Sequence, residues 1–132
     1  MSQLECVVVT PEKTTLSQTA DSVVLPMFDG EMGILKGHSP LVGRLAYGAL
    51  RLRTGSTVQQ YYVDGGFVQV VKNRVTVLTD RMIPMDQLSL EQAQKGLEEA
   101  LKLPATSPDK MQIRDRAISQ MRAQLHLASK AK

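Results

Sequence analysis

The chain is built around residues 28–41, which read Phe-Asp-Gly-Glu-Met-Gly-Ile-Leu-Lys-Gly-His-Ser-Pro-Leu. Gly30 and Gly33 are expected to supply the positive φ angles of tight turns, because a Cβ atom disfavours that region. A third glycine and a proline end the short apolar run that follows them. The stretch therefore predicts a strand, a tight corner and a second strand, with Glu31 and His38 at exposed bends.

Short runs of β-branched and aliphatic residues fill most of the chain up to about residue 80, and such runs favour strands. In residues 49–53 leucine alternates with arginine, so Leu50 and Leu52 are expected to face a core. Turns are expected at Tyr47-Gly48, Thr54-Gly55-Ser56, Asp64-Gly65-Gly66 and Lys72-Asn73. Because no helical pattern interrupts the strands, the sequence predicts an antiparallel β-sandwich.

The hydrophobic period changes near residue 87 and becomes helical. Ser89 and Gln92 have the spacing of a capping box, and Ser107 precedes Pro108 as the cap of a second helix. The expected apolar faces consist of Leu90, Ala93, Leu97, Ala100 and Leu101, and of Met111, Ile118, Met121, Leu125 and Ala128. The predicted fold class is β + α, with a β-sandwich domain over residues 1–86 and an antiparallel two-helix hairpin domain over residues 87–132.

The composition predicts an aliphatic core, because only 4% of the 132 residues are aromatic and none is tryptophan. The single cysteine, Cys6, cannot form an internal disulfide and is expected to be a small core residue. No stretch is long and apolar enough to span a bilayer, and the first residues lack the pattern of a signal peptide. We therefore expect no direct membrane insertion, and contact with a membrane only through protein partners.

The positive charge is concentrated at the C-terminal end, where residues 109–132 hold six Lys or Arg against two Asp or Glu. This excess could steer the second helix to an acidic partner. The sequence has no phosphate-binding Gly-rich loop, no Cys/His metal spacing and no recognised catalytic motif. It therefore predicts no catalytic residues, no metal, no cofactor and no enzymatic activity of the chain by itself.

Residues 28–41 resemble the signature of the epsilon subunit of bacterial F-type ATP synthases, which is called delta in mitochondria. Residues 62–70, Tyr-Val-Asp-Gly-Gly-Phe-Val-Gln-Val, and residues 74–80, Arg-Val-Thr-Val-Leu-Thr-Asp, resemble that family's Gly-Gly hairpin and Val-Thr-Val-Leu strand. The resemblance implies a non-catalytic central-stalk (rotor) subunit that joins the gamma subunit to the c-ring of the membrane sector. It also implies a peripheral position on the cytoplasmic face of the bacterial plasma membrane.

The resemblance assigns roles to individual residues of the β-sandwich. It implies that Glu31 and Met32 belong to a loop that faces the c-ring, and that Thr10 and His38 face gamma. Read from the residues alone, Glu31 is a solvated hairpin tip and His38 a turn residue that bonds its neighbours.

The resemblance also implies that the helices can contact the alpha/beta catalytic head and inhibit ATP hydrolysis. The residues concerned are Lys110, Arg114, Arg116 and Arg122, which would otherwise form an ordinary solvated helix face. In some relatives a motif at the start of the first helix binds ATP. Here Ser89 and Gln92 replace its Asp and Arg, so we expect no ATP binding, since the bidentate phosphate donor is lost.

Two other functions fit the composition. One is a stand-alone nucleotide-responsive sensor, which the altered motif disfavours. The other is a small nucleic-acid-binding barrel, suggested by the basic C-terminal end. Three Tyr and two Phe offer few platforms for base stacking, so we expect no nucleic-acid partner.

Overall fold

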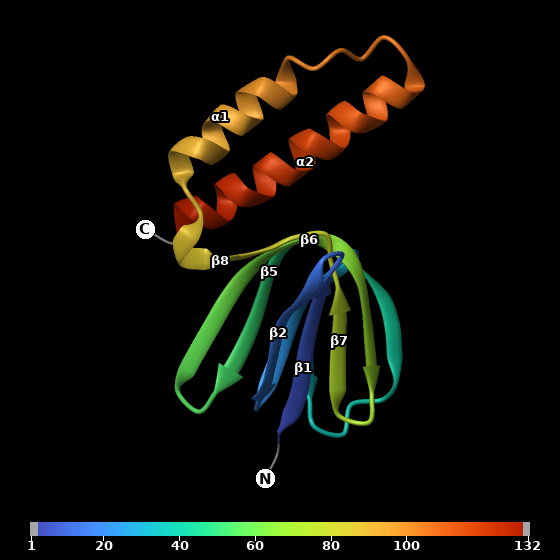
Figure 1. The fold of residues 1–132 in the computed structure, drawn as a ribbon, viewed down its shortest axis with the longest axis vertical. Helices are drawn as coiled ribbons and strands as arrows, with labels where there is room; N and C mark the ends of the chain where they lie inside the picture. Colours follow the sequence, from blue (N-terminus) through green and yellow to red (C-terminus); the bar gives the residue numbers. More distant parts are fainter. Residues whose placement is uncertain (1–2, 131–132) are drawn as a thin grey trace. The chain divides into compact units, whose positions relative to one another are not determined.

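The computed structural model describes residues 3–130 and divides the chain into two compact units between Ile83 and Pro84. The strands are β1 (Leu4–Thr10), β2 (Lys13–Ala20), β3 (Ser22–Met27), β4 (Gly30–Leu35), β5 (Leu41–Thr54), β6 (Thr57–Val71), β7 (Arg74–Leu78) and β8 (Met82–Pro84). A 3₁₀ turn, η1 (Met85–Gln87), precedes helices α1 (Leu90–Leu101) and α2 (Pro108–Lys130). Figure 1 shows the strands wrapped around one core and the two helices running antiparallel. The predicted fold class, a β-sandwich followed by a helical hairpin, is confirmed.

The strands form one hydrogen-bonded path in the order β2-β1-β7-β6-β5-β3-β4, and β8 pairs with β6. The strand pairs β1–β2, β3–β4, β5–β6 and β6–β7 are antiparallel, as expected for hairpins. The pairing of β1 with β7 is parallel, with Val8 opposite Val77. Sequence periodicity does not report strand direction, because an inward-facing residue alternates in the same way in both kinds of ladder.

The two longest strands, β5 and β6, bend over from one layer of the sandwich to the other. In β6 the core-facing residue is Val63 before the bend and Val68 after it, so the inward positions change from odd to even numbers. Gly65 and Gly66 lie between them with φ angles of 72° and 114°. The expected turns at Tyr47-Gly48 and Asp64-Gly65-Gly66 are therefore wrong: both strands continue through these positions, and pairing resumes on each side.

The core of the sandwich is aliphatic, as the composition predicts, and it contains fully buried valines and leucines from both layers. Leu50 and Leu52 face this core, which confirms the alternating pattern of β5. Cys6 is fully buried, and this burial raises the pKa of its thiol to about 12. The thiol therefore stays protonated and serves as a small apolar group.

The stretch at residues 28–41 differs in detail from the expectation. Gly30 has a φ of 130°, but Gly33 lies within β4 and is not among the positive-φ glycines. Glu31 is also a strand residue, opposite Pro26, so its expected place at a bend is wrong. Lys72 and Asn73 have φ angles of 50° and 65°, which confirms the two-residue hairpin.

Both predicted helix caps are present in the second unit. The backbone N–H of Gln92 donates to Ser89 Oγ at 3.2 Å, and that of Lys110 donates to Ser107 Oγ at the same distance. The apolar faces are less regular than the periodicity predicts. Leu101 and Met111 were expected to face inward, but both are exposed.

Candidate functional site

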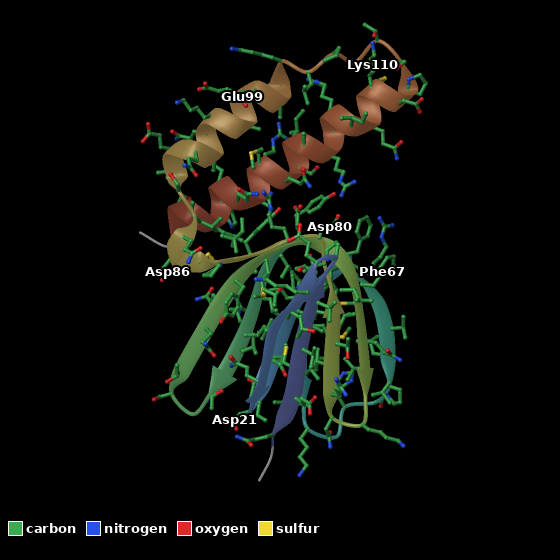
Figure 2. The ribbon with its side chains drawn as sticks, viewed as in Figure 1. Asp21, Phe67, Asp80, Asp86, Glu99 and Lys110 are labelled. Atoms are coloured by element: carbon green, nitrogen blue, oxygen red, sulfur yellow. The ribbon has the colours of Figure 1, made fainter. Side chains whose placement is uncertain are left out.

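An apolar strip lies on the outer face of strands β5, β6 and β7, and we call it the outer strip. It consists of Val42, Phe67 and Leu78, whose side chains are 75%, 56% and 52% exposed. Phe67 is paired directly with Leu78 on one side and with Arg44 on the other, so these residues share a face of the sheet. Figure 2 shows Phe67 toward the end of the sandwich opposite Asp21.

A shallow groove of about 440 Å³ adjoins the outer strip at that end. Its lining comes from β1, β6, β7 and the segment after β7, namely Val9, Thr10, Pro11, Gly66, Phe67, Leu78, Thr79 and Asp80. At the groove β6 passes very close to β7, since a Cβ atom on Gly66 would overlap the carbonyl oxygen of Leu78. The sequence-predicted residue Thr10 therefore borders an apolar depression that periodicity alone does not reveal.

His38 lies at the other end of the sandwich from Thr10. Its backbone N–H donates to the Leu35 carbonyl at 3.1 Å, and its Nδ1 lies 2.7 Å from the Ser39 carbonyl oxygen. The neighbouring Gly37 N–H donates to Asn73 Oδ1 at 2.7 Å, which ties this turn to the β6–β7 hairpin. Since β1 runs parallel to β7 from this hairpin up to Leu78, the two predicted gamma-facing residues are not brought together.

Glu31 lies on β4, an edge strand, and its side chain is 57% exposed. The guanidinium of Arg51 on β5 approaches it, with 3.3 Å between Nη2 and Oε1. Met32 points the other way and packs against the core. Of the two residues assigned to a c-ring-facing loop, only Glu31 presents a charged group at the surface.

The four basic residues of α2 do not share one face of the helix. At 3.6 residues per turn, Lys110, Arg114 and Arg122 fall within an arc of about 120°, whereas Arg116 lies about 200° from Arg114. Lys110, Arg116 and Arg122 are exposed, and Arg114 is half-buried with its Nη1 3.9 Å from Asp115 Oδ1. The four residues therefore do not form one basic face, and a single flat partner cannot contact all of them at once.

A polar cluster at the bend of β6 was not anticipated from the sequence. Tyr62 Oη donates to Asp64 Oδ1 at 2.6 Å, and the Asp64 N–H lies 3.1 Å from both Thr79 Oγ1 and the Arg81 carbonyl. Asp64 and Thr79 are buried. The cluster ties the segment after β7 to the bend, which helps to shape the groove.

Within residues 3–130, no group of His, Cys, Asp or Glu is arranged to hold a metal ion. No helix in this part of the chain is long and apolar enough to cross a membrane. The altered ATP motif lies at the start of α1, where the Ser89 hydroxyl accepts the bond from Gln92 that caps the helix.

The fold matches two solved structures closely. A chain in the cryo-EM structure of the Euglena gracilis mitochondrial ATP synthase, OSCP/F1/c-ring, superposes with a TM-score of 0.82 at 24% identity, over 99% of this chain and 81% of that one. A chain in the central stalk/c-ring structure of the Tetrahymena thermophila mitochondrial ATP synthase gives a TM-score of 0.75 at 17% identity, over 95% and 96%. At these identities the likeness establishes the shared fold.

Sequence relatives extend the likeness beyond the fold. The ATP synthase epsilon chain of Rhodopirellula baltica is 52% identical over 122 residues, which cover 92% of this chain and 95% of the relative. That of Granulibacter bethesdensis is 40% identical over 114 residues, covering 86% and 84%. Residues 3–85 match the family described as "ATP synthase, Delta/Epsilon chain, beta-sandwich domain". With its sandwich and most of its length accounted for, the chain belongs to the ATP synthase delta/epsilon chain family.

Proposed function

We propose that this chain is a central-stalk (rotor) subunit of a proton-translocating F-type ATP synthase, and that its outer strip and groove bind the gamma subunit. The observation that carries the proposal is the outer strip, because three large apolar side chains lie exposed on neighbouring strands. Contiguous apolar surface of this kind usually marks a protein-binding site. The names of the sequence relatives, and a solved relative that belongs to a central stalk and c-ring, support the same assignment.

The outer strip, Thr10 and His38 would together form one surface that binds the gamma subunit. Thr10 borders the groove at one end, and His38 lies in the turn at the other. The outer strip crosses β5, β6 and β7 beside the groove, and Val42 is its member nearest to the His38 turn. The gamma subunit, bound along this face, would contact the groove, the outer strip and the His38 turn. The outer strip would supply most of the binding free energy.

The remaining surfaces fit contacts with the rest of the complex. Glu31 presents its carboxylate from an edge strand, which suits a polar loop of the c-ring. Lys110, Arg114 and Arg122 suit an acidic segment of the alpha/beta catalytic head, and binding there would slow ATP hydrolysis. The chemistry at the phosphate would belong to that head, so this chain would be non-catalytic, peripheral, and located on the cytoplasmic face of the bacterial plasma membrane.

The proposal is tested with the full chain and an assembled alpha-beta-gamma head that lacks it. Phe67→Ser is expected to weaken binding to this head about tenfold or more, because a central apolar anchor is lost. Val58→Ser is the matched control, since Val58 is also exposed on β6, at 51%, but lies before the bend and outside the strip. Equal affinities for the two variants would refute gamma binding at the outer strip.

A further inference from the structure

Small side chains occupy the buried positions of α1, whereas α2 buries Ile118 as well as Ala128. The buried residues of α1 are Ala93 and Ala100. Larger apolar side chains are exposed near the loop that connects the two helices. They are Leu101 at 46%, Leu103 at 38%, Met111 at 49% and Ile113 at 63%. Little apolar area is therefore removed from water at the loop end of the hairpin, and the pairing there depends on the close contacts that exist.

One close contact joins Gly96 on α1 to Met121 on α2. A Cβ atom built on Gly96 would overlap the Met121 sulfur and lie 3.3 Å from its Cγ. The methionine side chain would therefore have to shift to admit a side chain at position 96. Gly96 is also an interior helix residue, where glycine costs about 1 kcal/mol relative to alanine.

The surroundings of this contact are also built from small residues. Ala100 follows Gly96 by one helical turn, and Ala117 precedes Met121 by one turn. All four residues line a depression of about 280 Å³ between the helices, together with Glu99, Leu103 and Gln120. Few neighbouring side chains can replace the contact if it is lost, because alanine reaches only a short distance from its backbone.

We propose that Met121 seated on Gly96 is a latch that holds α1 against α2, and that the hairpin opens when this contact is lost. The latch accounts for a glycine in the interior of a helix, because the backbone of α1 comes close to the Met121 sulfur on α2. An effect of the latch on ATP hydrolysis would rest on the proposed function, whereas its effect on the pairing of the helices does not.

Amide hydrogen exchange of the full chain tests the latch through a double-mutant cycle. Gly96→Ala is expected to lower the protection of α1 amides about tenfold, although alanine is the better helix former. In the double variant Gly96→Ala/Met121→Ala the added Cβ has room, so protection is expected to be no lower than in Met121→Ala alone. Gln94→Ala is the control, because Gln94 is exposed on α1 and its replacement changes helix propensity only.

Two results would overturn the latch. One is a rise in protection for Gly96→Ala that matches Gln94→Ala. The other is a loss of amide protection on Gly96→Ala that is equally large in the original chain and in the Met121→Ala variant. If Gly96→Ala alone fails to fold, rescue by Met121→Ala supports the latch and failure of rescue refutes it.

A separate measurement distinguishes the latch from the proposed inhibition of ATP hydrolysis. Hydrolysis of ATP by the assembled enzyme is measured with the same variants. If the hairpin opens and the rate of ATP hydrolysis is unchanged, the proposed inhibition is refuted, whereas the latch is supported.

Discussion

Arg51 reaches across β3 to the carboxylate of Glu31 on β4, with 3.3 Å between Arg51 Nη2 and Glu31 Oε1. Both side chains remain partly exposed, at 37% and 57%. Exposed ion pairs contribute about 0–1 kcal/mol to stability, because water screens the charges and ordering two long side chains costs entropy. The pair can therefore be broken without endangering the fold, which makes Glu31 a suitable probe of the proposed c-ring contact.

Glu31→Gln is expected to leave the free energy of unfolding within about 1 kcal/mol of its original value and to lower ATP-driven proton pumping in membranes. The reason is that the carboxylate that would meet the c-ring is gone while the backbone of β4 is unchanged. Arg51→Gln is the control, since it breaks the same ion pair but keeps the carboxylate, and it should preserve pumping. A full pumping rate for Glu31→Gln would remove the c-ring assignment.

The basic residues of α2 are expected to act from one side of the helix. Replacing Lys110, Arg114 and Arg122 by glutamine should raise ATP hydrolysis by the assembled enzyme about fivefold, because the charge attraction to the catalytic head is lost. Arg116→Gln, on the other side of α2, should have little effect. The rate should be measured at two salt concentrations, since screening weakens such a contact. Equal effects of Arg116 and the other three would contradict a one-sided interface.

The chain is expected not to bind ATP at the start of α1. Ser89 is engaged in the helix cap, and Gln92 carries no guanidinium for a phosphate. A ligand that binds only the folded chain must raise its melting temperature, so millimolar ATP should leave Tm unchanged. Isothermal calorimetry gives the complementary measurement, and saturable binding in the micromolar range would favour the nucleotide-sensor alternative.

Gly66 is expected to be the least replaceable glycine of the sandwich. Its φ of 114° disfavours a side chain, and an added Cβ would overlap the Leu78 carbonyl oxygen. Gly66→Ala should therefore lower the free energy of unfolding by about 2–3 kcal/mol, measured by denaturant titration. Gly33→Ala is the matched control: nothing lies within 4 Å of its Cβ position, so a change of about 0.5 kcal/mol or less is expected. Similar losses for both variants would show that the bend at Gly66 is not under this constraint.

The buried thiol of Cys6 makes stability depend on alkaline pH. Burial raises its pKa from 9.0 to about 12, so between these values the unfolded chain loses the thiol proton while the folded chain keeps it. The free energy of unfolding should therefore fall as the pH rises through this window, at up to about 1.4 kcal/mol per pH unit. Cys6→Ala should lack this contribution, and the difference between the two chains isolates it. Parallel pH profiles for the two chains would contradict the assignment.

Local patterns were enough to predict the parts of this protein that depend on neighbouring residues. The alternation of Leu50 and Leu52 predicts their burial, since the pleat sends successive side chains to opposite faces. Ser89 and Ser107 predict the helix caps, because a cap joins residues three positions apart. The Lys72-Asn73 hairpin follows from two residues that tolerate its geometry.

The tertiary structure decided what depends on distant residues. The glycines at 65 and 66 predict a turn, yet β6 continues through them. The strand bends and does not end there, because it pairs with β5 and packs on the core on both sides of the bend. The outer strip required Phe67 and Leu78 to be neighbours, and this follows from strand register. The same holds for the helices, where Gly96 and Met121 meet only after α1 and α2 pair. Periodicity predicted which residues favour strands and helices, whereas register and close approach, which no local pattern contains, placed the surfaces and the latch.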